Sequence, residues 1–161
     1  MPMSARRRAV ITAALAALGL AGLGGLATDI GPWYLNLKQP SWKPPDILFG
    51  PAWTVIYALA AVSAVKAWER VANKAWRQWL IGLFGLNGVL NLLWSFLFFH
   101  LQRPDWALLE VGALWLSVAG LMLFVGRRSP VSAVLLLPYL AWVAFAACLN
   151  RTVVALNAPF G

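Results

Sequence analysis

The sequence predicts an all-α integral membrane protein, a bundle of five transmembrane helices, from its composition and from its long apolar runs. Of its 161 residues, 61% are hydrophobic and 11% are charged, with a mean hydropathy of +0.73. Soluble domains of this size carry a far larger charged share. A membrane span needs about 20 apolar residues. Runs of about that length cover residues 9–27, 48–65, 78–99, 106–125 and 131–150.

These runs occupy most of the chain, so we expect one membrane domain over residues 1–161 and no soluble domain. The connections between the runs are short, which predicts that successive helices are antiparallel neighbours. Pro138 lies inside the fifth run and predicts a kink, because proline supplies no N–H to the helix.

The basic residues predict an orientation in the bilayer. With five spans, one side of the membrane receives nine Lys and Arg residues: Arg6, Arg7, Arg8, Lys66, Arg70, Lys74, Arg77, Arg127 and Arg128. The other side receives only Lys38, Lys43, Arg103 and Arg151. This bias predicts a cytoplasmic N-terminus and an external C-terminus. The net charge of +8 therefore indicates contact with anionic membrane lipid, and we expect no nucleic-acid partner.

The first run has two interpretations. Three arginines before an Ala/Leu-rich stretch also fit a secretory signal peptide. The stretch is longer than a typical signal core, and its glycines suit close packing against other helices. We therefore expect the first helix to be retained.

Few residues in the spans suggest catalysis or metal binding. The single histidine, His100, ends the third run and fits an interfacial side chain better than a haem-iron ligand. With one cysteine, Cys148, and no second histidine, we expect no metal site. Glu110, early in the fourth run, is either a functional acid or a residue that favours the positive end of its helix.

Polar and aromatic residues within the spans instead form faces at helical spacing. Amides in lipid must find hydrogen-bond partners, so the face of the third run that carries two of them should point into the bundle. The plain alternative is helix–helix packing with aromatic belts at the membrane surfaces. Trp142 fits a belt poorly because it lies about halfway along the fifth run. The faces consist of Trp53 and Tyr57, of Asn87, Asn91 and Trp94, and of Tyr139, Trp142 and Ala146.

Several motifs resemble the TspO/MBR family of tryptophan-rich sensory proteins, translocator proteins and peripheral-type benzodiazepine receptors. The resemblance begins in the first loop and continues in order through the last four spans, whereas the first span matches only in character. It rests on Trp33-Tyr34, Lys38-Gln39-Pro40, Trp42-Lys43-Pro44-Pro45, Gly50-Pro51-Ala52-Trp53, Tyr57, Leu90-Asn91, Trp94, Phe98-Phe99, Trp106-Ala107-Leu108 and residues 138–150.

The resemblance implies five packed helices, a homodimer, and a pocket that opens toward the first loop. It implies porphyrin-type ligands, protoporphyrin IX or haem, bound without any required cofactor. Positions that match the family place several side chains at this pocket, namely Trp42, Trp53, Tyr57, Asn91, Trp106, Trp142 and Ala146, and Asn87 stands where an amide is common. The helix faces add Trp94 and Tyr139 to these ligand-binding candidates. We expect the protein in a bacterial plasma membrane, with the outer membrane as the alternative.

Two positions depart from the family pattern. The family has a proline within two residues of the position of Trp94, but this chain has Ser95-Phe96, which predicts a straighter third helix. The tyrosine of the animal cholesterol motif is replaced by Arg151, so we do not expect cholesterol as the native ligand.

Three functions remain open at this stage: a receptor or sensor that regulates tetrapyrrole handling, which we favour, a porphyrin transporter, and a light-dependent porphyrin-degrading enzyme. Only the third would give Trp53 and Trp142 a catalytic role. We expect these two indoles to face each other across one cavity and to stack on the ligand, with Tyr57 and Asn91 as polar anchors. Lys38 and Lys43 could meet its carboxylates, but the favoured interpretation of both is a solvated loop charge. Small residues at 82, 85 and 88 predict that the third helix forms the dimer interface.

Overall fold

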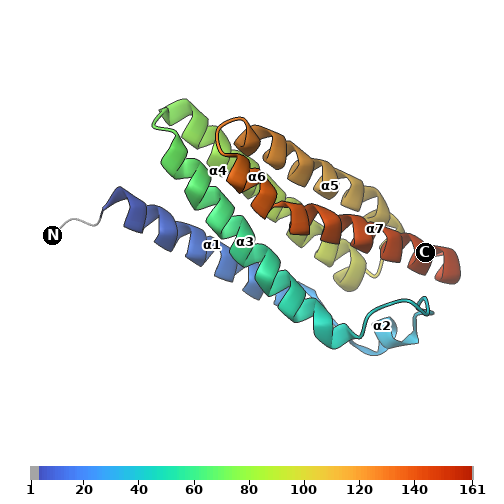
Figure 1. Ribbon diagram of the computed structural model, residues 1–161. Helices are drawn as coiled ribbons and strands as arrows, with labels where there is room; N and C mark the ends of the chain where they lie inside the picture. The colour runs from blue at the N-terminus through green and yellow to red at the C-terminus, as the bar shows by residue number, and fades with distance from the viewer. Residues whose placement is uncertain (1–3, 161) are drawn as a thin grey trace.

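Five helical segments cross the length of the bundle in the computed structural model, which describes residues 4–160 (Figure 1). The long helices are α1 (Ala5–Ala27), α3 (Phe49–Arg70), α4 (Lys74–Ser95), α5 (Pro104–Gly126) and α7 (Leu137–Asn157). Short α6 (Pro130–Leu135) leads into α7, and short α2 (Pro32–Asn36) lies in the first loop. No strand occurs within the described range. Each of the five segments is long and apolar enough to span a membrane, so the chain is an all-α integral membrane protein.

The helices close into a ring whose order differs from their order in the sequence. Helix α1 packs on α3, α3 packs on α6, and α5 packs on both α6 and α7; α4 then joins α5 back to α1. The expectation that all successive helices are neighbours is wrong for α3 and α4, which share few contacts although three residues connect them. The short turn brings only their adjoining ends together. Along the rest of their length, α1 packs against both helices.

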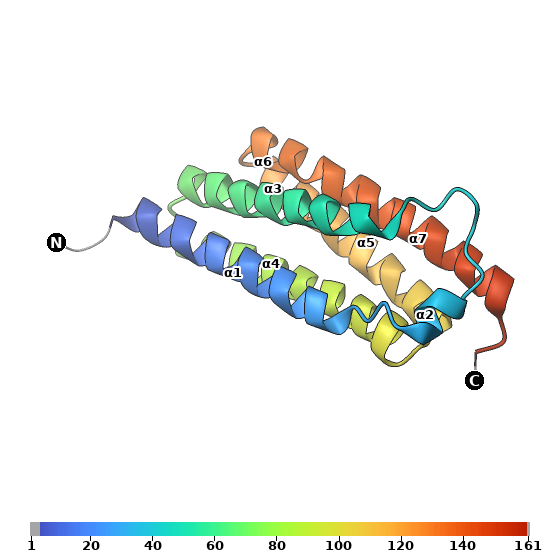
Figure 2. The ribbon, with the colours of Figure 1, turned by 90° about the horizontal axis from the view of Figure 1, so that it is seen from below.

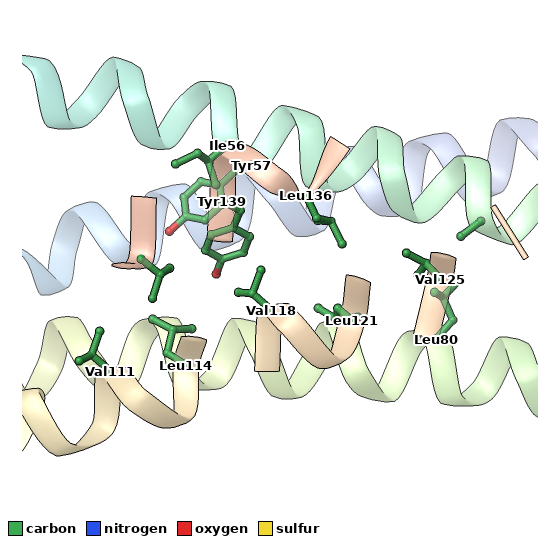
Figure 3. Close-up of a cluster of buried hydrophobic side chains, with 12 residues drawn as sticks. Ile56, Tyr57, Leu80, Val111, Leu114, Val118, Leu121, Val125, Leu136 and Tyr139 are labelled. Carbon is green, nitrogen blue, oxygen red and sulfur yellow. The ribbon is translucent and has the colours of Figure 1, made fainter. Parts of the chain in front are cut away.

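Helix α5 supplies the centre of the core. Its buried residues recur every three or four positions, and the helix packs on α4, α6 and α7. Figure 3 shows Val111, Leu114, Val118, Leu121 and Val125 of this set in one cluster with Tyr57 and Tyr139. The buried α5 set is Pro104, Ala107, Val111, Leu114, Val118, Leu121 and Val125. By contrast, α1 has no buried residue, so it lies at the periphery of the bundle.

The helix ends extend beyond the apolar runs. The second span continues to Arg70 rather than 65, the third begins at Lys74 rather than 78, and the fifth continues to Asn157 rather than 150. The apolar runs mark only the lipid-facing part, whereas helical hydrogen bonding continues through charged residues whose long side chains reach the membrane surface.

The fifth span is interrupted as predicted, but the break lies before the proline. Residue Leu136 separates α6 from α7 and has φ −90° and ψ −8°. Pro138 cannot donate to the carbonyl four residues earlier, and its ring crowds that carbonyl, so the distortion falls on the preceding turn.

The third span does not continue as a regular α-helix to its end. After Ser95 it widens into a π-helical turn, Phe96–His100, and the Arg103 N–H bonds the Leu97 carbonyl at 2.9 Å. The wider turn allows Phe98 and Phe99 to reach the first loop together, where they contact Trp33 and Tyr34 at ring-centroid distances of 6.1 and 5.5 Å.

Candidate functional site: an aromatic cavity beneath the first loop

A cavity of about 460 Å³ lies where α1, α3, α4 and α7 approach the first loop, residues 28–48. We call it the aromatic cavity. The loop lies across this end of the bundle, close to the C-terminal end of α7 (Figure 2). Its volume falls within the range of small-molecule sites, roughly 300–1,000 Å³. The principal ring-bearing wall residues are Tyr34, Phe49, Trp53, Tyr57, Trp94, Phe98, Phe99 and Trp142.

Trp53 is the centre of the aromatic wall. It stacks on Tyr57, one helical turn later, with ring centroids 5.3 Å apart and an interplanar angle of 27°. It meets Tyr139 and Trp142 of α7 edge-to-face, at 5.9 and 6.4 Å. Trp53 and Trp142 therefore share one cavity, as predicted, but they touch each other. The expectation that they face each other across an open space is wrong, because a flat ligand cannot enter between rings already in contact.

A continuous chain of hydrogen bonds forms the floor of this cavity. The Tyr57 hydroxyl donates to Asn91 Oδ1 at 2.7 Å, and Asn91 Nδ2 donates to the Tyr139 hydroxyl at 3.1 Å. Tyr139 donates to Asn87 Oδ1 at 2.9 Å, and Asn87 Nδ2 donates to Ser117 Oγ at 2.8 Å. The chain joins α3, α4, α7 and α5, so the buried amides are satisfied by neighbouring helices.

This chain limits the anchoring role expected of Tyr57 and Asn91. The proton of the Tyr57 hydroxyl is already donated, and Asn91 uses both its oxygen and its amide nitrogen. Asn91 still has a second N–H and a second lone pair on its oxygen, and the Tyr57 oxygen can still accept a hydrogen bond. Their established role in the structure is to connect helices and to close the cavity floor.

The charged residues at the mouth of the cavity are paired with each other. Lys43 forms an ion pair with Asp46 and donates to the Tyr34 hydroxyl at 3.0 Å, while that hydroxyl donates to Asp46 at 2.8 Å. Partial burial lowers the pKa of the Lys43 ammonium, but the bonds to Asp46 and Tyr34 outweigh this effect and raise that pKa above its ordinary value. The Lys43 ammonium thus stays charged and is already paired with Asp46, so it is neither a free carboxylate-binding group nor the solvated loop charge that we favoured.

The first loop is also fastened to the end of α7. Asn157 Oδ1 accepts the Lys38 backbone N–H at 2.8 Å, and Asn157 Nδ2 donates to the Lys38 carbonyl at 2.9 Å. Lys38 therefore acts through its backbone in this structure. The two bonds hold the loop against the C-terminal end of α7.

Six of the ten predicted ligand-binding residues line the aromatic cavity: Trp53, Tyr57, Asn91, Trp94, Trp142 and Ala146. The other four do not. Asn87 and Tyr139 lie beyond the floor as members of the hydrogen-bond chain. Trp42 is half-exposed and reaches Trp142 only through Phe145, and exposed Trp106 is covered by the Arg103 guanidinium at 4.3 Å.

Sequence reasoning missed Gln39 as an individual site residue. Its side chain lines the aromatic cavity, and its Nε2 is buried without a hydrogen-bond partner among the described residues. A buried unpaired donor costs free energy unless a ligand or water meets it. Its position in a loop after Lys38 gave no periodic signal, and only its place in the family-like Lys38-Gln39-Pro40 run could have indicated it.

His100 and Glu110, the histidine and the acid considered from the sequence, lie outside this cavity lining. His100 stacks on Phe96 with ring centroids 4.9 Å apart, in keeping with an interfacial side chain. Both carboxylate oxygens of Glu110 are buried and find no partner within residues 4–160. Glu110 therefore remains open as a functional acid, although it does not border the aromatic cavity.

The protein is a small five-helix membrane bundle with a tryptophan-lined cavity under its first loop. Comparison with known sequences shows which class of membrane proteins has this sequence pattern. A model of the TspO/MBR family matches residues 10–156. The chain is 39% identical over 146 residues to the tryptophan-rich protein TspO of Archaeoglobus fulgidus, covering 90% of this chain and 93% of the relative.

Two further relatives extend this similarity to bacteria and animals. The tryptophan-rich sensory protein of Cereibacter sphaeroides is 34% identical over 89% of this chain and 88% of its own length. The human translocator protein is 32% identical over 75% of this chain and 72% of its own length. The chain belongs to the TspO/MBR family of membrane sensory and translocator proteins.

Proposed function

We propose that this protein is a membrane receptor that binds a flat, apolar, carboxylate-bearing ligand of the porphyrin class in the aromatic cavity and regulates tetrapyrrole handling. The observation that carries the proposal is the combination of a rigid aromatic wall with one unpaired buried donor. Trp53, Trp142 and Trp94 offer large apolar surfaces, and Gln39 Nε2 offers a hydrogen bond that no residue of the described chain accepts.

The contacts among the rings suggest how such a ligand would lie. Because Trp53 and Trp142 touch, the disc would rest against their combined surface on the cavity side. The polar groups of the floor are already paired with one another, whereas Gln39 on the loop side keeps an unpaired donor, so we place the carboxylate edge of the ligand at the loop, beside the Gln39 amide. Aromatic side chains have few rotatable bonds, so they lose little entropy when a ligand orders them.

A binding role agrees with the closed floor of the cavity. Transport across the bilayer would require the Tyr57–Asn91–Tyr139 bonds, which link three helices, to separate during each cycle. Purified protein titrated with protoporphyrin IX in the dark tests the binding role, and porphyrin flux into proteoliposomes tests transport. Saturable binding without flux supports the receptor; flux that the Tyr57→Phe variant accelerates would favour the transporter.

Light-dependent degradation is the second candidate, and one observation favours it. Trp53 contacts Tyr57, Tyr139 and Trp142, so an oxidised indole would have three redox-active aromatic neighbours. Illumination of the saturated complex, with porphyrin absorbance followed against a dark control, separates this activity from binding. Loss of absorbance that requires both the protein and light would establish it.

A further inference from the structure

A second cavity, of about 640 Å³, lies between α1, α3 and α4 on the other side of the Tyr57 hydroxyl. We call it the alanine-lined cavity. Helices α1 and α4 approach closely near Gly88, where an added Cβ would lie 3.7 Å from the Leu20 side chain. Toward the ends that hold Ala5 and Lys74 the space opens, and a Cβ at Gly85 would meet nothing within 4 Å.

The lining of this cavity is long and apolar. Along α1 it extends from Ala5 to Leu20, and small residues predominate on both α1 and α3: Ala5, Ala9, Ala13, Ala16, Ala17, Ala60, Ala61 and Ala64. From Arg8 to Leu20 the helix rises about 18 Å at about 1.5 Å per residue. Half of a hydrocarbon core of about 30 Å is similar in length. The cavity therefore matches one acyl chain of a single leaflet.

The charged residues that line this cavity are both arginines, Arg8 and Arg77. The Arg77 guanidinium stacks on Trp68 at 4.4 Å and donates to the Trp68 carbonyl at 3.2 Å. Its Nε is buried and has no partner among residues 4–160. The one carboxylate near this end, Glu69, is paired with Arg6 at 2.9 Å and does not line the cavity.

We propose that the alanine-lined cavity binds an anionic membrane phospholipid, with one acyl chain along α1 and the headgroup phosphate at Arg77 and Arg8. Charge complementarity between an anionic headgroup and the two arginines favours this occupant. Both arginines lie at the end of the bundle that is rich in Lys and Arg. A phosphate oxygen would satisfy the Arg77 Nε by a charge-assisted hydrogen bond. This site is separate from the aromatic cavity, and its test does not depend on porphyrin binding.

The test is native mass spectrometry of the purified protein after incubation with equal amounts of phosphatidylglycerol and phosphatidylcholine that carry identical chains. We expect the wild type to retain phosphatidylglycerol preferentially. Arg77→Gln should reduce that preference roughly fivefold, the effect of one basic residue near a bilayer surface. Arg128→Gln is the matched control, since Arg128 is an exposed basic residue that does not line the cavity.

A second pair of variants tests the acyl-chain half of the site. Gly85→Leu places a side chain in the cavity and should reduce retention of both lipids, whereas Gly82→Leu, one turn away and outside the lining, should not. Circular dichroism of each variant confirms that helix content is unchanged.

Three results would overturn the proposal. One is an Arg77→Gln variant that keeps the wild-type lipid preference. Another is a loss of bound lipid in both Gly82→Leu and Gly85→Leu, accompanied by dissociation of a dimer. That result would place the lipid between two copies of the chain. The third is equal competition by free glycerol phosphate, which would show that the arginines bind a phosphate without any acyl chain.

Discussion

The Tyr57 hydroxyl lies 2.7 Å from Asn91 Oδ1 and joins α3 to α4, two helices that otherwise share few contacts. Tyr57 also borders both the aromatic cavity and the alanine-lined cavity. On the α1 side, an added Cβ at Gly24 would lie 3.8 Å from the same hydroxyl, which leaves little room between them. One tyrosine thus both stabilises the α3–α4 interface and separates two potential ligand sites.

The hydrogen-bond chain predicts an order of stabilities for two tyrosine variants. Tyr57→Phe removes one bond, whereas Tyr139→Phe removes two, because the Tyr139 hydroxyl both accepts from Asn91 and donates to Asn87. Interhelical bonds in membranes contribute about 0.6 kcal/mol on average and reach about 1.7 kcal/mol. Thermal unfolding in detergent should therefore show a larger loss for Tyr139→Phe. Equal melting temperatures for the wild type and Tyr139→Phe would show that the chain adds no stability.

Gln39 should distinguish ligands that carry carboxylates from ligands that do not. Gln39→Ala removes the unpaired Nε2 donor and should weaken protoporphyrin IX binding by about 1.5–3 kcal/mol, the scale of a hydrogen bond to a charged group. The dimethyl ester lacks the charge, so its affinity should change much less. Gln102→Ala, in an exposed loop position, is the control. Equal losses for acid and ester would assign Gln39 a packing role.

The charge bias predicts the orientation of the bundle. The nine Lys and Arg residues at the α1, α3–α4 and α5–α6 end should face the cytoplasm, which places the C-terminus outside. A C-terminal alkaline phosphatase fusion should be active and a C-terminal fluorescent-protein fusion should not fluoresce. The reverse pattern, or cleavage of residues 1–27 in the mature protein, would refute this topology.

Glycines on α4 predict self-association. Gly88 packs against Leu20 of α1 within the chain, but an added Cβ at Gly82 would meet nothing within 4 Å. An exposed small residue lets another helix approach closely. We expect Gly82→Leu to convert a homodimer to a monomer in size-exclusion chromatography with light scattering, with Gly112→Leu on α5 as a control that leaves the dimer intact. A dimer that survives Gly82→Leu must use a different face.

The parts of the fold that could be predicted depend on periodic apolar spacing. The five spans and the placement of Trp53, Tyr57, Asn91 and Trp142 at one cavity follow from helical repeats and from the family resemblance. The order of the helices around the ring could not be predicted from the sequence. The apolar repeat of a helix indicates its buried face but not which helix that face contacts. The π-helical turn at Phe96–His100 likewise leaves no mark in the apolar pattern.

The first loop gave the least reliable predictions. Trp42 was placed at the pocket by the family resemblance, and Lys43 was considered as a carboxylate partner because of its charge. In the structure Trp42 packs on Phe145 and Lys43 pairs with Asp46. Loop side chains have no period that fixes their direction, so their partners depend on tertiary contacts. Gln39 was missed for the same reason, since an unpaired donor is recognised only when its surroundings are known.

The central claim is that the joined indoles of Trp53 and Trp142 form the binding wall, and the dark affinity for protoporphyrin IX tests it most directly. Each single Trp→Phe change should cost roughly 1–2 kcal/mol, the scale of one aromatic contact beyond area burial, and the double variant should lose more. Trp79→Phe, a change at an exposed indole outside the cavity, should bind as the wild type does. A folded Trp53→Phe/Trp142→Phe double variant with wild-type affinity would contradict the account.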